Sequence, residues 1–435
     1  MVEHSEWIWA KPKITLQKRY AIKRGITIGD GSMSIVYKGL DTKECRNVAV
    51  KVYRNSDDEA IQSFEKSLNV LKAIAGKDSE CSFANSPLDL SEVESLVGGR
   101  GAEEELRSNN SCKKPDSRGP RYDARSSFNT ELLDEDIQKV SQGFSTDALL
   151  ADMDFSSCFI RPFGHSLNEE GEPGLDPDFN CLYIIFELGE LSLEEYIDSC
   201  RDQGRTLSVS ELRDLHWALV TIVCGLHCRG LVHLDIKPCN VMRFKSKSGR
   251  PQWRLIDLDG ALEAGSVVSP EDVTITPLYM PPEVAASLGK IRVSRLMDVW
   301  SVGMCALQAI FFQPILSPWY REWMEETGTD EKFYKWLSDY KTEAILSGDM
   351  RQAVSAIDDD MCDLLDGMLT KDPAKRLGIT ACLSHPWFSP VRDNIIHTST
   401  TEAGSPPPQS ASRVQWTSDC SKVATRMSSQ VCTSM

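Results

Sequence analysis

The sequence HLDIKPCN at residues 233–240 is the most informative stretch of this chain. It places a carboxylate at Asp235, an ammonium at Lys237 and a carboxamide at Asn240 within one loop. The sequence LIDLD at residues 255–259 follows, and its first aspartate ends an apolar strand. Transfer of a phosphoryl group to a hydroxyl uses such groups: one that orients the attacking oxygen, a cation for the phosphate, and oxygen ligands for magnesium. The two segments together therefore favour phosphoryl transfer.

Two segments nearer the N-terminus add groups that are suited to binding phosphates. The sequence IGDGSMSIV at residues 28–36 is a Gly-rich turn between two strands, and glycine lets a backbone approach phosphates closely. The sequence VAVK at residues 48–51 places Lys51 in an apolar, alternating strand. Taken alone, these segments are also explained by a plain hairpin turn and a surface lysine. Their weight comes from their order along the chain.

Three downstream segments complete this order: TPLYMPPE at residues 276–283, DVWSVG at 298–303 and KDPAKR at 371–376. Together, the segments resemble the motifs of the protein kinases, from the Gly-rich loop to the end of the domain. A lysine two positions after the aspartate of the catalytic loop is the pattern of the serine/threonine members of that family. The resemblance covers roughly residues 20–390, apart from an insertion.

This resemblance implies the α+β, two-lobed protein kinase fold. The small, β-rich N-lobe would comprise residues 20–75 and 156–189. The larger and mainly helical C-lobe would comprise residues 190–390.

The other parts of the chain differ in composition from this domain. Residues 1–19 are interpreted as a short leader. Residues 76–155 hold 17 acidic and 9 basic residues and little apolar periodicity, which predicts an acidic, disordered insertion within the N-lobe. Residues 391–435 are rich in Ser and Thr and predict a disordered tail.

The catalytic roles of the family would fall on three residues of this chain. Asp235 would accept the proton of the substrate hydroxyl or align that hydroxyl, and Lys237 would neutralise charge on the moving phosphoryl group. Thr276 would bond to both of them. Asn240 and Asp257 would bind Mg2+, the cofactor that the resemblance implies together with ATP as co-substrate.

The resemblance also implies a nucleotide site. Lys51 matches the lysine that grips the α- and β-phosphates of ATP. Phe186 matches the residue that limits the depth behind the adenine, and residues 187–189 would bind the adenine through backbone groups. The implied ATP-binding residues are Gly29, Gly31, Val36, Ala49, Lys51, Phe186, Glu187, Leu188 and Gly189.

Three residues match positions that support such a site from behind. Asp298 would bond to the backbone of the catalytic loop. Arg376 would pair with Glu283, which ends the activation segment.

Three of the departures from the family pattern bear on activity. The first helix should carry a glutamate that pairs with Lys51, but the register places Ser67 there. The helix is shifted, the lysine uses another acid, or the pair is absent. Leu234 replaces the arginine that holds a phosphorylated activation loop, so loop phosphorylation is not expected to be the main switch. Asp259 replaces a glycine and adds a negative charge near the phosphates, unless a metal or a cation offsets it.

Hydrophobic periodicity and turn signals predict the secondary structure. A helix is expected at residues 210–228, opened by a capping signal at Ser210. Further helices are expected to begin at Asp298, Asp330 and Ala356. The expected strands are 21–28, 34–39, 47–53 and 182–187, and the expected first helix is 58–75.

Bulk properties narrow the class of protein. The 435 residues carry a net charge of −16, which argues against nucleic acid or an anionic membrane as the main partner. No secretory signal is visible, and the most apolar stretch, residues 299–316, is expected to be a buried helix and not a membrane span. The 14 cysteines form no Cys-x-x-Cys pair and are expected to be reduced thiols of a cytoplasmic protein, with a nuclear location left open.

The sequence thus predicts a serine/threonine protein kinase that transfers the γ-phosphate of Mg-ATP to protein substrates. Its oligomeric state is not indicated. The departures from the pattern leave a pseudokinase open as the alternative: a scaffold or nucleotide-binding module with little or no phosphoryl transfer. A kinase-fold enzyme that acts on a small molecule or a lipid is the third interpretation.

Overall fold

The computed structural model describes residues 13–31, 33–75, 153, 155–245, 251–270, 273–287, 289–342 and 344–393. Residues 1–12, the tail from residue 394 and the predicted insertion up to residue 152 lie outside the described residues. The predictions for these segments therefore remain predictions. The chain divides into one unit formed by residues 1–85 and 154–435 and another formed by residues 86–153, and every element named below belongs to the first.

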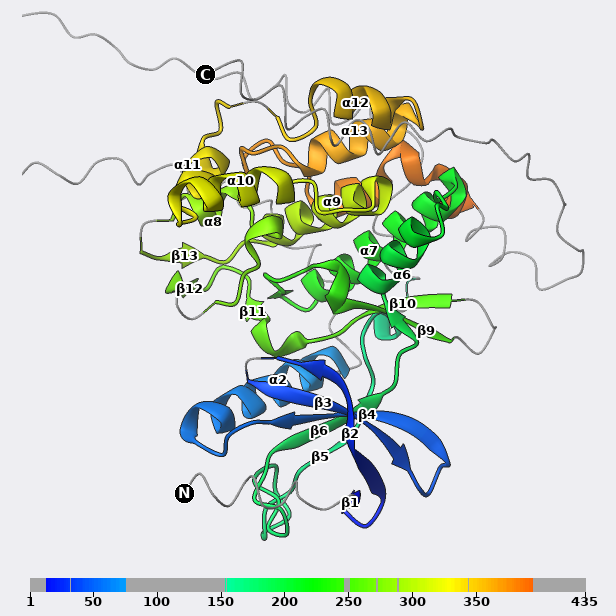
Figure 1. Cartoon of the computed structure of the whole chain (residues 1–435), viewed down its shortest axis with the longest axis vertical. Coiled ribbons are helices and arrows are strands. Elements are labelled where there is room, and N and C mark those ends of the chain that lie inside the picture. Colours follow the sequence, from blue (N-terminus) through cyan, green and yellow to red (C-terminus); the bar gives the residue numbers. More distant parts are fainter. Residues whose placement is uncertain are drawn as a thin grey trace, which may run out of the picture. The chain divides into compact units, whose positions relative to one another are not determined.

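The N-terminal part of this unit is a six-stranded antiparallel sheet with the strand order β1-β2-β3-β4-β6-β5 (Figure 1). Alternate residues of its strands are apolar and form one buried cluster, which includes Val48, Val50 and Ile185. The strands are β1 (Lys13–Leu16), β2 (Tyr20–Asp30), β3 (Ser34–Asp41), β4 (Arg46–Tyr53), β5 (Pro162–His165) and β6 (Tyr183–Glu187).

Strand β1 corrects the prediction of a separate leader at residues 1–19. Its residues pair with β2, and Ile14 and Leu16 are buried in the core cluster. The end of the predicted leader therefore belongs to the sheet. The four strands predicted from the sequence are present as β2, β3, β4 and β6. Each end lies within two residues of its predicted position.

Helix α2 (Asp58–Ala75) has the predicted bounds and covers the sheet beside β4. Its buried stripe includes Phe64, Leu68 and Leu71. The ring of Phe64 meets the ring of Tyr53 of β4 edge to face, with the centroids 5.8 Å apart. The helix is therefore held against the strand that carries Lys51.

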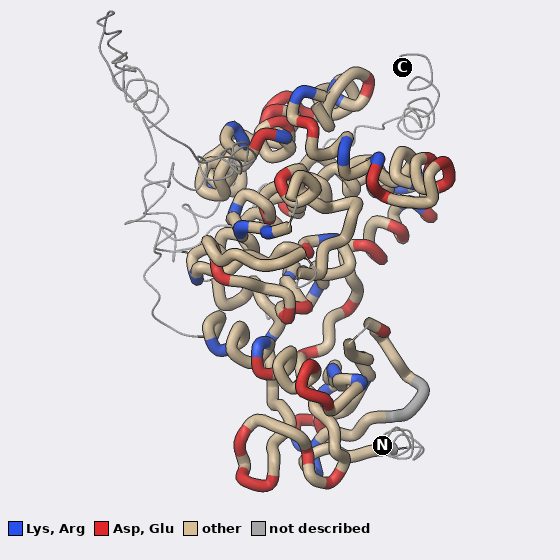
Figure 2. The backbone as a smooth tube through the Cα atoms, turned by 90° about the vertical axis from the view of Figure 1, so that its left-hand side faces the viewer, with Lys and Arg blue, Asp and Glu red and all other residues tan. Residues whose placement is uncertain are grey.

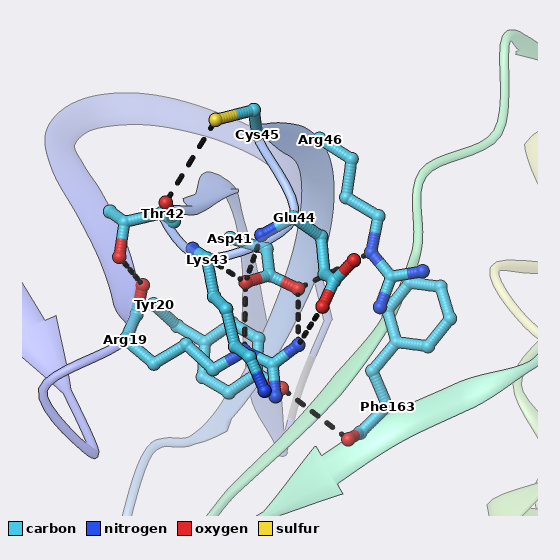
Figure 3. A network of polar contacts seen from close by, with 9 residues as sticks. All are labelled: Arg19, Tyr20, Asp41, Thr42, Lys43, Glu44, Cys45, Arg46 and Phe163. Atoms are coloured by element: carbon cyan, nitrogen blue, oxygen red, sulfur yellow. Dashed lines mark hydrogen bonds and ion pairs between the residues drawn. The ribbon is translucent and has the colours of Figure 1, made fainter.

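A network at the far end of the sheet is centred on Asp41, whose side chain is fully buried (Figure 3). The Arg19 guanidinium donates two hydrogen bonds to its carboxylate, at 2.8 and 2.7 Å, and Arg46 donates a third. The backbone amides of Lys43 and Glu44 donate as well. The hydrogen bonds from Arg19 hold the pKa of Asp41 well below its ordinary value, so this carboxylate ties the turns before β2 and β4 together.

The C-terminal part is mainly helical, with short strands between the helices (Figure 1). Its helices are α6 (Leu193–Asp202), α7 (Val209–His227), α8 (Pro282–Ala285), α9 (Arg295–Phe311), α10 (Ser317–Thr327), α11 (Glu331–Ser338), α12 (Gly348–Ser355), α13 (Asp359–Met368) and α14 (Ile379–Ser384). Its strands are β7 (Leu191–Ser192), β8 (Leu231–Val232), β9 (Val241–Lys245), β10 (Pro251–Leu255), β11 (Leu262–Glu263), β12 (Val267–Val268) and β13 (Ile291–Arg292). Short 3-10 turns are η2 (Phe155–Cys158), η3 (Pro238–Asn240), η4 (Leu258–Gly260), η6 (Pro277–Tyr279) and η7 (Pro386–Phe388).

The predicted cap of α7 at Ser210 is wrong. The helix begins at Val209, and Ser208 is its cap. The Ser208 hydroxyl accepts from the Glu211 amide at 3.2 Å, and the Glu211 carboxylate accepts from the Ser208 amide at 2.8 Å. This reciprocal pair satisfies two backbone donors at once, which a cap at Ser210 would not achieve.

Two other predicted helix starts are also displaced. The helix expected from Ala356 begins at Asp359, because Asp358 caps it, and Ala356 ends α12. The helix expected from Asp298 begins three residues earlier, after the cap Ser294. Nearly all of α9 is buried, which explains its apolar sequence. No helix among the described residues is both long enough and apolar enough to cross a membrane.

Candidate active site

The catalytic-loop segment follows β8, and a buried carboxylate from α9 fixes its start. Asp298 accepts hydrogen bonds from the backbone amides of His233 and Leu234, both at 2.9 Å. The ring of His227 lies 3.0 Å from the same carboxylate. Leu234 has a left-handed backbone with φ of 69°, which is costly for a leucine, so Asp298 stabilises an unusual turn. The contact that the resemblance implies for Asp298 is present.

Asp235, Lys237 and Thr276 form a closed triangle of hydrogen bonds. The Lys237 ammonium lies 2.6 Å from one Asp235 oxygen and donates to the Thr276 hydroxyl at 2.9 Å. That hydroxyl donates to the other Asp235 oxygen at 2.7 Å. Burial opposes the charge of Lys237, but the carboxylate of Asp235 outweighs burial and raises the pKa of the ammonium. The contacts to Lys237 and Thr276 thereby fix the orientation of the Asp235 carboxylate.

Asn240 and Asp257 are held next to each other by the backbone. The Asn240 side-chain amide donates to the Asp235 carbonyl at 2.9 Å, and the Ile256 amide donates to the Asn240 carbonyl at 2.9 Å. Asp257 follows directly, with a left-handed backbone at φ of 58° and a half-exposed side chain. The oxygen donors in this part of the site are the Asp257 carboxylate and the Asn240 amide oxygen, which has a weak contact of 3.8 Å from the Cys239 thiol.

These donors fit magnesium that is bound together with a nucleotide. Mg2+ takes oxygen ligands, and in nucleotide sites it uses one or two protein groups with phosphates and waters. Within the part of the chain that the structure describes, no group of three or more His, Cys, Asp or Glu side chains is arranged to hold a metal ion by itself. Asn240 and Asp257 therefore match a magnesium site that is completed by phosphates and waters, and not a site formed by protein groups alone.

Lys51 reaches this site from β4. Its ammonium lies 2.8 Å from an oxygen of Asp257 and forms a second ion pair with Asp259. Its side chain is 11% exposed. Burial opposes the charge of Lys51, but the carboxylates of Asp259 and Asp257 outweigh burial and raise the pKa of the ammonium.

The α2 side of Lys51 is neutral. Ser67 occupies the place of the expected glutamate and is buried. Its hydroxyl donates to the Ser63 carbonyl at 2.8 Å and lies 2.9 Å from the Tyr53 hydroxyl. Of the three alternatives that the sequence left open, the structure has the second: the lysine pairs with other acids, Asp257 and Asp259.

The sheet register brings the expected nucleotide-binding residues into neighbouring positions. Val36 pairs with Lys51, and Ala49 pairs with Phe186. Gly29 pairs with Val36, and a Cβ atom built on Gly29 would lie 3.3 Å from the Val36 side chain. Gly31 donates its backbone N–H to the Ser34 carbonyl at 2.9 Å, which closes the Gly-rich turn.

The segment after Phe186 is fixed by two residues whose roles the sequence did not reveal. Arg254 of β10 forms a buried ion pair with Glu187, whose carboxylate also accepts from the Arg161 amide at 2.8 Å. A Cβ atom on Gly189 would lie 2.1 Å from the Met242 sulfur, so a larger residue there would displace the Met242 side chain. An arginine directly before the apolar residues Leu255 and Ile256 is the signal that could have pointed to the first contact. Leu188 lies between these two fixed positions.

Glu283 and Arg376 form the pair that the resemblance implies. The guanidinium donates to both carboxylate oxygens, at 2.7 and 2.8 Å, and both side chains are almost fully buried. Arg376 also donates to the carbonyls of Thr370 and Leu296. The pair therefore joins the end of the activation segment to α9 and to the late helices.

Backbone pairing orders the activation segment. Strand β11 pairs with β8, and β12 pairs with β13. The Gly265 N–H donates to the Val293 carbonyl, and the Val293 N–H donates to the Ser266 carbonyl, both at 2.8 Å. Leu234, at the position of the missing arginine, is buried and apolar. That a phosphate group is not needed to hold the segment remains a prediction.

Comparisons with known proteins agree with this geometry. The family model for the protein kinase domain matches residues 176–388. Cyclin-dependent kinase B1-1 of Arabidopsis thaliana is 30% identical over 229 residues, which cover 48% of this chain and 70% of that protein. The sheet and the helical C-terminal part fit the two-lobed kinase fold. The chain is therefore a member of the eukaryotic-type protein kinase family.

Proposed function

We propose that the protein is an active serine/threonine kinase that transfers the γ-phosphate of Mg-ATP to protein hydroxyls. The observation that carries the proposal is the triangle of Asp235, Lys237 and Thr276 beside the oxygen donors of Asn240 and Asp257. It contains each group that a phosphoryl transfer to a hydroxyl uses.

In this proposal, the fixed Asp235 carboxylate receives the substrate hydroxyl and holds its proton. Lys237 offsets the negative charge that moves with the phosphoryl group. Asn240 and Asp257 would hold magnesium, which neutralises phosphate charge when it is bound. Lys51 would bind the phosphates of ATP. A positioned base contributes about 10²- to 10⁴-fold in rate, so the loss of Asp235 should be readily measurable.

The class of acceptor follows from the same residues. Lys237 and Thr276 match the serine/threonine pattern, and the relative named above is itself a cyclin-dependent kinase. In the view of Figure 2, acidic and basic residues are interspersed along the backbone. Together with the net charge of −16, this supports protein substrates over nucleic acid. The similarity to a cyclin-dependent kinase supports our proposal that the protein acts in the cytoplasm or the nucleus.

The second candidate is a pseudokinase, and one observation favours it. Lys51 and Asp257, which would bind phosphate and metal, are bound to each other, and Asp259 adds a further negative charge to the site. A nucleotide must compete with these ion pairs. A scaffold with weak nucleotide binding would have the same structure.

Transfer of radiolabel from ATP to a generic basic protein, in the presence of magnesium, separates the two candidates. The wild type should transfer label, and Asp235→Asn should lower the rate by about 10²-fold or more. Asp202→Asn is the matched control, because this side chain is 73% exposed on α6. Equal labelling by the wild type and Asp235→Asn would favour the scaffold.

A further inference from the structure

We propose that Asp259 is the positioning residue for Lys51. Its carboxylate takes the place of the helix glutamate that the family pattern provides, so that Asp257 is available to magnesium. This inference rests on the proposed function. It begins from the two carboxylates that meet one ammonium, Asp257 at 2.8 Å and Asp259 in a second ion pair.

The α2 side of the lysine offers no charge to replace Asp259. Lys51 and Tyr53 lie two positions apart on β4 and therefore share one face of the strand. The Tyr53 hydroxyl bonds to Ser67, and Ser67 bonds to the Ser63 carbonyl. This neutral chain of hydrogen bonds satisfies the buried hydroxyl groups between the strand and the helix.

Turn η4 supplies the missing carboxylate because it lies against α2. Asp259 is part of this turn, directly after the left-handed backbone of Asp257. The turn thereby directs both aspartates toward Lys51. In the family pattern the position of Asp259 is a glycine, which could not do so.

The two aspartates differ in exposure, and the difference assigns their roles. The Asp259 side chain is 24% exposed and the Asp257 side chain 50%. A largely buried ammonium needs a counter-charge that remains in place. Asp259, the more shielded of the two, can keep Lys51 charged and directed while the more open Asp257 turns to a metal ion.

The experiment moves the carboxylate from the turn to the helix. Asp259→Asn should lower kcat/KM for ATP about 10- to 100-fold, because a displaced phosphate-binding group misplaces the nucleotide. The combined variant Asp259→Gly with Ser67→Glu restores the family arrangement and should recover to within about threefold of wild type. Ser67→Glu should not rescue Asp257→Asn. Glu263→Gln, an exposed change in β11, is the matched control.

Affinity for Mg-ATP, measured by calorimetry, provides a readout that does not depend on turnover. If the wild type transfers no label, the proposed function fails, but the inference still predicts weaker binding by Asp259→Asn and recovery in the combined variant. Thermal melting checks that each variant is folded. If Asp259→Asn does not fold, the kinetics and binding of the combined variant test the inference. Unchanged kinetics and binding in Asp259→Asn, or a loss that the combined variant does not recover, would overturn the inference.

Discussion

Two ionic groups of this molecule use similar side chains but differ in exposure. Glu283 and Arg376 are 2% and 0% exposed and share two hydrogen bonds. Lys51 is also shielded, at 11%, but its partners Asp257 and Asp259 are 50% and 24% exposed. The first group is closed to solvent on both sides, and the second is open on its acidic side.

The difference separates a structural pair from a binding site. Removing one member of a closed pair leaves the other buried without a counter-charge, so the pair is costly to break. In the open group, the exposed carboxylate can exchange a protein partner for a metal ion or can be hydrated. The two groups should therefore respond differently to mutation, the closed one in stability and the open one in ligand binding.

The largest effect is expected from Glu283→Gln, which breaks the closed pair. The Arg376 guanidinium would stay buried without its carboxylate, and the free energy of unfolding should fall by about 3–5 kcal/mol. Denaturant titration of the purified variant measures the loss. Glu326→Gln is the matched control, because its partner Lys332 lies 2.6 Å away on the surface and the loss there should be below about 1 kcal/mol. Similar losses from the two substitutions would show that exposure does not distinguish the pairs.

A smaller effect is expected from His216, a buried titratable side chain whose protonation makes the free energy of unfolding depend on pH. Burial lowers the pKa of His216 from 6.5 to about 3, so the ring stays neutral in the folded protein. The unfolded chain takes up the proton first as the pH falls through 6.5, and stability is lost below that pH. Between pH 7.5 and 5.5 the loss from this group should be about 1 kcal/mol.

The variant His216→Leu should lack this part of the pH dependence. Denaturant titrations at the two pH values give the free energies of unfolding for both proteins. Lowering the pH from 7.5 to 5.5 should reduce the free energy of unfolding of the wild type by about 1 kcal/mol more than that of the variant. A constant difference would mean that the ring is protonated in the folded state as readily as in the unfolded chain.

An effect of about the same size is expected from Tyr53→Phe, which tests the neutral side of Lys51. The change removes the hydrogen bond to Ser67, but Ser67 keeps its bond to the Ser63 carbonyl. The free energy of unfolding should fall by about 0.5–1.5 kcal/mol. Tyr340→Phe is the control, because that ring is 40% exposed. A loss as large as that of Glu283→Gln would mean that this side of the lysine is also a closed, essential network.

The sequence predicted the elements that are defined by local patterns. Helix α2 has its predicted bounds because its apolar stripe and its flanking turn residues are both clear. The contacts of Asp298 and the pair of Glu283 with Arg376 were implied by motifs whose order along the chain was specific. In each case a short segment carries most of the information.

Features that depend on a distant partner were not predictable in the same way. The two acids that pair with Lys51 lie 206 and 208 positions away, and only the folded chain selects them from the open alternatives. Strand β1 is four residues long, and its pairing with β2 gives it its structure. The cap of α7 was misplaced by two residues because two serines lie close together, and the reciprocal bond to Glu211 decides between them.

The contact between Arg254 and Glu187 has a consequence for the choice of nucleobase. One oxygen of this carboxylate is engaged by the guanidinium and by the Arg161 amide, so the side chain is committed to the protein. A purine that docks at residues 187–189 then meets peptide groups whose donors and acceptors are the same in every sequence. In the proposed nucleotide site, the Glu187 side chain is therefore not free to read the base, and this residue can offer the base only its backbone.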